Sequence, residues 1–120
     1  MQKVTGIGGL FFRAKDPEAL GKWYTDTLGV EGLPNIWMQS AGPTVLAPFA
    51  DDTDYFDRPN QQWMINFRVA DLDSMIAQLR AQNIEVITKA EWNYEAGRFA
   101  RIQDPEGNPI ELWQPPMEGQ

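Results

Sequence analysis

The feature that most constrains this chain is a weak internal repeat of a strand-like run followed by a helical pattern. Residues 10–16 read Leu-Phe-Phe-Arg-Ala-Lys-Asp, and residues 65–71 read Ile-Asn-Phe-Arg-Val-Ala-Asp. Each run ends in an aspartate and precedes apolar residues at helical spacing. We therefore expect two units of the same topology within one domain of 120 residues, a length that can bury a core of its own.

Each aspartate of the repeat is suited to begin a helix. Asp16 is a good N-cap, Pro17 fits the first helical turn, and Gly29 is a natural stop after the first helix. Asp71 repeats the capping pattern, and Asn83 lies near the end of the second helix. An apolar stripe follows each cap, formed by Leu20, Trp23, Tyr24 and Leu28 in the first helix and by Leu72, Met75, Ile76 and Leu79 in the second.

Short strand candidates follow each helix. The residues Asp104-Pro105-Glu106-Gly107 have turn chemistry and should join the last two strands as a hairpin. The expected strands cover residues 36–39 and 44–49 in the first half, and residues 85–88, 99–103 and 110–114 in the second. These patterns predict two βαβββ modules in a single domain of residues 1–120: module 1 over about residues 4–50, a polar linker over about 51–61, and module 2 over about 62–115.

Residues 97–113 read GRFARIQDPEGNPIELW. This tail, together with the two βαβββ units and the glycine-ended first helix, resembles the vicinal oxygen chelate family of glyoxalases, extradiol dioxygenases and bleomycin-resistance proteins. The resemblance extends from about Gly6 to Pro115. It implies an α+β fold in which two βαβββ modules form a cup-shaped mixed β-sheet with helices on its outer face. It also implies a homodimer.

Enzymes of that family hold a divalent metal with histidine and glutamate. The resemblance puts the four ligand seats on Gly9, Leu46, Met64 and Glu111, of which only the last carries a suitable side chain. The chain contains no histidine and no cysteine, so neither imidazole nor thiolate can replace the missing ligands. Because zinc or nickel takes at least three protein ligands in such sites, we predict no metal ion and no other cofactor.

Alternation along the strands predicts which side chains line the cup. The seats define one face of the sheet, and the residues between them are apolar, as expected for a face packed under helices. Trp37 is a candidate for the mouth of the cup, and Trp92 lies in a turn-like segment that could act as a flap. The predicted ligand-binding residues are Phe11, Arg13, Trp37, Met64, Asn66, Arg68, Trp92, Arg101 and Trp113.

Glu111 has two open interpretations. As a functional residue it would act as a general base or hold a cationic group of a ligand in the cup. As a structural residue it would pair with arginine. In that second case Arg13, Arg68, Arg101 and Glu111 would satisfy one another in a closed ion-pair network.

Composition excludes several classes of partner. The formal net charge of −7 and the pI near 4.4 argue against nucleic acid, because phosphate binding needs a basic face. No apolar run approaches the roughly 20 residues needed to span a bilayer, and the N-terminus has no signal-peptide pattern. We therefore expect no membrane partner and a cytoplasmic location.

Four functions remain open at this stage. The first is a metal-free protein that binds a small organic molecule, similar to bleomycin-resistance proteins. The second is a metal-independent lyase or isomerase with Glu111 as base. The third is a metal-dependent glyoxalase or dioxygenase with displaced ligands, and the fourth is an interaction protein whose cup is filled by its own side chains. The sequence names no ligand and no substrate.

Overall fold

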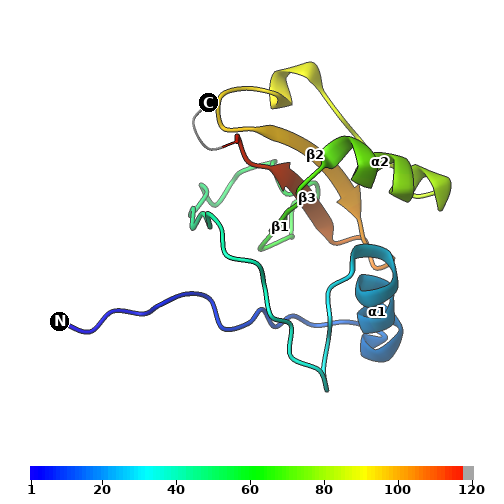
Figure 1. Ribbon diagram of the computed structural model, residues 1–120. Helices are drawn as coiled ribbons and strands as arrows, with labels where there is room; N and C mark the ends of the chain where they lie inside the picture. The colour runs from blue at the N-terminus through cyan, green and yellow to red at the C-terminus, as the bar shows by residue number, and fades with distance from the viewer. Residues whose placement is uncertain (118–120) are drawn as a thin grey trace.

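The computed structural model describes residues 1–117. Its regular elements all lie within residues 17–114, and long irregular segments precede and separate them (Figure 1). In chain order they are the helix α1 (Pro17–Trp23), a π-helical turn η1 (Tyr24–Leu28), the strand β1 (Ile65–Arg68), the helix α2 (Leu72–Ala81), a 3₁₀ turn η2 (Ala90–Trp92), and the strands β2 (Arg98–Gln103) and β3 (Pro109–Gln114).

Both predicted helices form, with the predicted caps. The carboxylate of Asp16 accepts a hydrogen bond from the Ala19 amide at 3.1 Å, and that of Asp71 accepts one from the Ser74 amide at the same distance. The first helix widens into the π-helical η1 turn and stops at Gly29, whose φ of 74° is left-handed. Glycine reaches that conformation without steric cost, so the sequence signal for the stop was specific.

The three strands make one mixed sheet in the order β1–β3–β2. β3 lies in the centre, parallel to β1 and antiparallel to β2. The predicted hairpin between residues 103 and 109 is confirmed, because the Gly107 amide donates to the Asp104 carbonyl at 2.9 Å and closes the turn. The two strands of this hairpin begin one residue earlier than the sequence analysis placed them.

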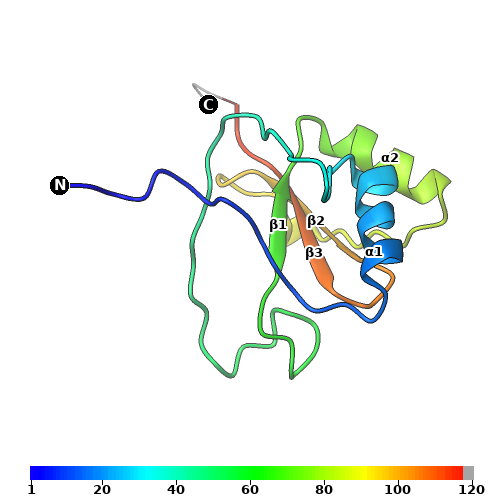
Figure 2. The ribbon, with the colours of Figure 1, turned by 90° about the horizontal axis from the view of Figure 1, so that it is seen from below.

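Side-chain alternation divides the sheet into two faces, as predicted. Figure 2 shows α1 and α2 on one side of the sheet, while the chain around residues 45–60 passes along the other. On the helical side the strand residues are almost fully buried and join the helix stripes in one core; these are Leu20, Leu72, Ile76, Leu79, Ala100, Ile102, Ile110 and Leu112. The opposite side, which we call the open face, carries Asn66, Arg101, Glu111 and Trp113.

The hairpin turn also fixes the sheet to α1, which the sequence analysis did not foresee. The Tyr24 hydroxyl donates to buried Asp104 at 2.7 Å, and burial together with this carboxylate raises the pKa of Tyr24 well above its usual value. The Glu106 carboxylate accepts hydrogen bonds from the backbone amides of Lys15 and Asp16. The turn thus holds the start of α1 against the end of β2.

The prediction of two βαβββ modules is wrong for this structure. Residues 10–16, 36–39 and 44–49 form no strand, and of residues 85–88 only Ile87 makes a single bridge, to Arg101. The first half is interrupted by Pro34, Pro43 and Pro48. Proline cannot donate to a β-ladder, and Pro48 interrupts residues 44–49 in this way, whereas residues 10–16 and 36–39 contain no proline. The α+β class, the mixed sheet and the helices on one face are as predicted.

Within residues 1–117, no helix is long and apolar enough to cross a membrane.

Candidate functional site

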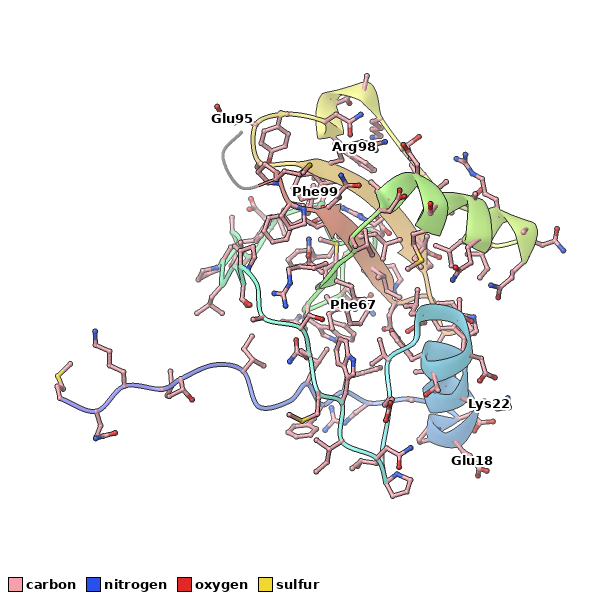
Figure 3. The ribbon with its side chains drawn as sticks, in the orientation of Figure 1. Glu18, Lys22, Phe67, Glu95, Arg98 and Phe99 are labelled. Atoms are coloured by element: carbon pink, nitrogen blue, oxygen red, sulfur yellow. The ribbon has the colours of Figure 1, made fainter. Side chains whose placement is uncertain are left out.

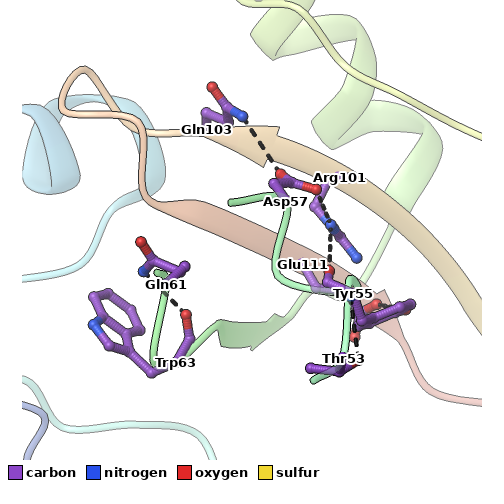
Figure 4. A network of polar contacts seen from close by, with 8 residues as sticks. All are labelled: Thr53, Tyr55, Asp57, Gln61, Trp63, Arg101, Gln103 and Glu111. Atoms are coloured by element: carbon purple, nitrogen blue, oxygen red, sulfur yellow. Dashed lines mark hydrogen bonds and ion pairs between the residues drawn. The ribbon is translucent and has the colours of Figure 1, made fainter. Parts of the chain in front are cut away.

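Glu111 forms the centre of the polar cluster on the open face. It lies in the middle of β3 and is only 9% exposed. Asn66 is its register partner on β1 and donates to one carboxylate oxygen at 2.8 Å. The Tyr55 hydroxyl donates to the other oxygen at 2.5 Å (Figure 4). Burial, followed by the hydrogen bond to Glu111, raises the pKa of Tyr55 to about 12, so this phenol remains a donor at neutral pH.

Arg101 is the cation of the cluster and the register partner of Glu111 on β2. Its side chain donates to the Asp57 carboxylate at 2.7 Å and to the Tyr55 carbonyl at 3.0 Å. The guanidinium carbon lies 4.6 Å from the centre of the Tyr55 ring and 5.7 Å from that of Trp92. Its Nε is buried without a hydrogen-bond partner in the described part of the chain. A buried donor of this kind is costly, and a ligand oxygen would relieve the cost.

A row of stacked aromatic rings lies beside the polar cluster. Trp113 and Phe99 are register partners, and their rings are nearly parallel, with an interplanar angle of 6° and centroids 6.1 Å apart. Tyr94 continues the row against Phe99 at 5.7 Å and 17° (Figure 3 labels Phe99). The Trp113 indole N–H donates to the Ala96 carbonyl at 2.8 Å, which fixes the ring. Trp113 is only 9% exposed and Tyr94 is 60% exposed, so the accessible end of the row is at Tyr94. Aromatic walls of this kind suit an aromatic ligand.

Gly97 lets the turn before β2 approach this row closely. A Cβ at this position would lie 2.3 Å from the Gln114 carbonyl oxygen and 2.8 Å from the Trp113 indole nitrogen. Its φ of +125° also lies in a region that favours glycine. Only glycine therefore fits between the turn and Trp113.

Four of the nine predicted ligand-binding residues meet at this site. Asn66, Trp92, Arg101 and Trp113 lie on or against the open face with Glu111. Phe11 and Arg13 are exposed on the irregular N-terminal segment, and Met64 is half-buried just before β1. Trp37 packs against Phe67, whose side chain belongs to the core. Side-chain alternation predicted the correct face of the sheet for residues in the strands. It does not apply to Phe11 and Arg13, because their segment is not a strand.

Arg68 binds a loop of the protein through its guanidinium group. Its guanidinium donates to the carbonyls of Ser40 and Pro43 and to the Thr44 hydroxyl. These bonds hold the loop of residues 40–44 against the end of β1. Glu111 accepts no bond from arginine among the described residues, so the closed network of Arg13, Arg68, Arg101 and Glu111 is not formed.

Tyr55 and Asp57 are two site residues that the sequence pattern did not predict, because both fall in the predicted polar linker. Both reach the open face and make the closest contacts to Glu111 and Arg101. Asp57 adopts a left-handed φ of 71°, which aspartate tolerates better than most residues. The one available signal was the aromatic pair Tyr55-Phe56 within an otherwise acidic stretch, since a solvated linker has no use for two large rings.

Comparison with known proteins agrees with this architecture. A sequence model of the Glyoxalase/Bleomycin resistance protein/Dioxygenase superfamily matches residues 6–112. The chain belongs to this superfamily. The resemblance inferred from the tail motif is therefore confirmed, whereas no curated protein sequence matches the chain at a significant level.

Two solved structures from one organism are similar to this chain. TnmS3, an antibiotic binding protein from Streptomyces sp. CB03234, is 25% identical, and the match covers 97% of this chain and 100% of TnmS3 with a TM-score of 0.63. A glyoxalase/bleomycin resistance protein from the same organism is 27% identical, with 83% of this chain and 92% of that chain covered and a TM-score of 0.51.

The residues present do not fit the divalent ion that enzymes of the superfamily use. Gly9, Leu46 and Met64, at the other ligand seats, offer no nitrogen, oxygen or thiolate donor from a side chain. Both oxygens of Glu111 already accept hydrogen bonds. Within residues 1–117, no group of three or more acidic, histidine or cysteine side chains is arranged to hold a metal ion. We therefore derive no chemistry through a metal.

Proposed function

We propose that this superfamily member binds a small organic molecule on its open face without the help of a metal ion. The observation that carries the proposal is the placement of the ring row of Trp113, Phe99 and Tyr94 beside Glu111 and Arg101 on one side of the sheet. Sites for small molecules combine apolar and aromatic walls with a few polar groups that fix orientation. This arrangement has both parts.

The chemistry of each group suggests the class of ligand. A planar ring system would stack on Trp113 and Phe99. A ligand carbonyl or anionic oxygen would accept from the unpartnered Nε of Arg101. A ligand hydroxyl or amine would donate to Glu111 in place of Tyr55 or Asn66. The likeness to TnmS3 along nearly the whole chain supports an antibiotic-like ligand of this kind.

Calorimetric titration with planar aromatic antibiotics, tetracycline and ciprofloxacin among them, tests the proposal. We expect saturable binding by the wild type and about fivefold weaker binding by Phe99→Leu, because a lost aromatic stack costs on the order of 1 kcal/mol. Trp23→Leu is the matched control, since it also replaces an aromatic side chain by leucine and lies in α1, on the other side of the sheet. Equal affinities for the two variants, or no saturable binding by any compound, would contradict the proposal.

A second candidate function is proton abstraction by Glu111 from a bound substrate. One observation favours it: Glu111 is 9% exposed, and its hydrogen-bond donors among the described residues are the uncharged side chains of Tyr55 and Asn66. Glu111→Gln keeps the shape of the side chain and removes the base. If the protein is a lyase or isomerase, this variant binds the ligand but no longer converts it, as followed by NMR of the ligand. Unchanged ligand with the wild type would leave binding as the sole activity.

We also propose that the chain acts as a homodimer. The irregular segments of residues 4–16 and 30–49 expose large apolar side chains, including Phe11 and Leu46 at 90%, Met38 at 86% and Ile36 at 80%. So much exposed apolar surface is typical of an interface. Size-exclusion chromatography with light scattering should give twice the chain mass of 13.6 kDa. A mass of one chain at micromolar concentration would refute the dimer.

A further inference from the structure

We infer that the protein has a second binding site, for a small organic anion with an apolar body, in a hollow between α2 and residues 88–93. The hollow has a volume of about 670 Å³, within the usual range for small-molecule sites. Its floor is the edge of the α2 stripe, where Leu72 and Ile76 are almost fully buried and Ala77 is exposed. The proposal does not depend on the function assigned to the open face.

The hollow lies on the opposite side of β2 from Glu111. Arg98, at the start of β2, projects toward the helices, because it donates to Asp73 of α2 at 2.7 Å (Figure 3). Arg101 is three residues further along the strand and contacts Tyr55 and Asp57 on the open face. Side chains an odd number of residues apart in a strand point to opposite faces. The two sites therefore lie on opposite faces of β2 and adjoin at its edge, where Phe99 also lines the hollow and Trp92 contacts both Lys89 and Arg101.

The charge of the lining is opposite to that of the protein. Three of the ten basic residues of the chain, Arg80, Lys89 and Arg98, line the hollow, against one of its 17 acidic residues, Asp73. The lining thus carries a formal charge of +2 in a chain of net charge −7. A local excess of positive charge attracts anions even when the whole protein is acidic.

Two of these cations are free to bind an anion. Arg80 donates to the Val86 carbonyl at 3.1 Å, and the Lys89 ammonium lies 5.2 Å from the centre of the Trp92 ring. Within residues 1–117, neither forms an ion pair. Their present contacts orient the side chains without cancelling their charge. A guanidinium has five N–H donors and an ammonium three, so both retain donors for a carboxylate or sulfonate.

The combination selects an amphipathic anion. An aromatic or short aliphatic body would cover Ile76 and Ala77, and its acidic group would reach Arg80 and Lys89. Inorganic phosphate alone would leave the apolar floor in water, and a neutral molecule would leave the cations unpaired. Aromatic carboxylates are the simplest members of the class that satisfies both requirements.

The test is a titration of ¹⁵N-labelled protein with 2-naphthoate, followed by amide chemical shifts. We expect saturable shifts at residues 76–80 and 88–93, and weaker binding at high salt. The double variant Arg80→Gln/Lys89→Gln should weaken binding about tenfold or more, because charge-assisted hydrogen bonds are lost. Lys3→Gln/Lys15→Gln is the matched control, since it removes the same charge elsewhere and should bind like the wild type.

A neutral analogue, 2-naphthalenemethanol, separates charge from shape. It should bind at least about tenfold more weakly than naphthoate to the wild type and equally to both double variants. Naphthoate shifts confined to Asn66, Arg101 and Glu111 would overturn the second site and leave the open face unaffected. Equal binding of naphthoate to the two double variants, or no saturation at millimolar concentration, would also overturn it.

Discussion

Replacing Tyr55 by phenylalanine removes a single hydroxyl from the candidate site and tests its central contact. In the wild type this hydroxyl donates to Glu111 at 2.5 Å, and Glu111 is 9% exposed. A hydrogen bond to a charged group contributes about 1.5–3 kcal/mol. Because Tyr55 is only half-buried, solvent screens part of this energy. We expect Tyr55→Phe to lower the free energy of unfolding by about 1–2 kcal/mol at pH 8.

The same contact predicts a pH dependence. The pKa of Tyr55 is raised from 10.0 to about 12 in the folded protein, chiefly by burial and then by the hydrogen bond to Glu111. A group with a raised folded pKa contributes stability that is fully present below its unfolded pKa and is lost as pH rises through its folded pKa. The wild type should therefore lose stability between about pH 10 and 12. Tyr55→Phe should lose less stability than the wild type over this pH range. The stability that this variant still loses is due to Tyr24, whose pKa is also raised.

Urea unfolding at pH 8 and at pH 11.5, followed by tryptophan fluorescence, measures both effects. A loss of 1–2 kcal/mol moves the urea midpoint by about 1 M, given the slopes usual for small domains. Tyr94→Phe is the matched control, because Tyr94 is 60% exposed and its hydroxyl makes no hydrogen bond among the described residues. If Tyr55→Phe unfolds at the same urea concentration as Tyr94→Phe at both pH values, the phenol does not support Glu111 and the reasoning fails.

Three further predictions concern the turns and the missing metal. Gly97→Ala should lower the free energy of unfolding by about 2–4 kcal/mol, because the new Cβ would lie 2.3 Å from a carbonyl oxygen. The control Gly21→Ala in α1 meets no atom within 4 Å and should raise the free energy of unfolding by about 0.5–1 kcal/mol. Thermal melts that rank the two variants equally would contradict this. Asp104→Ala should lower the free energy of unfolding in urea by about 3 kcal/mol, because Tyr24 and two backbone amides lose their hydrogen-bond acceptor. A loss below about 1 kcal/mol would show that the turn does not anchor α1. Addition of zinc, nickel, manganese or ferrous ions to chelator-treated protein should leave the melting temperature unchanged. A metal that did bind, at about 100 times its Kd, would stabilise the fold by about 2.7 kcal/mol. A rise in melting temperature that Glu111→Ala abolishes would therefore show that a metal site exists.

The parts of the fold that the sequence predicted are those with local causes. The caps Asp16 and Asp71 act on amides three residues away, and Gly29 stops its helix through its own backbone conformation. The turn at residues 104–107 closes on itself. Alternation in β2 and β3 requires only that the strands exist. Such signals are contained within a few residues, so reading along the chain is enough to find them.

The same reading placed part of the site. Asn66, Arg101 and Glu111 were predicted to share a face because each sits at the right parity in its strand, and register pairing brings both neighbours against Glu111. Phe11 and Arg13 were predicted by the same rule and lie elsewhere, because residues 10–16 are not a strand. Side-chain alternation predicts which face a residue lies on only where the backbone is hydrogen-bonded as a β-strand.

What the tertiary structure alone decided lies in contacts between distant residues. Tyr55 meets Glu111 across 56 positions, Asp57 meets Arg101 across 44, and Tyr24 meets Asp104 across 80. No local propensity encodes such pairs, because their energy depends on how the chain closes its loops rather than on its neighbours. The sequence by itself determined the helices, the hairpin, the superfamily and the loss of its usual metal ligands. Residues 30–64 pack against a sheet whose strands come after them in the sequence. That packing sets their path and places Tyr55 and Asp57 at the site.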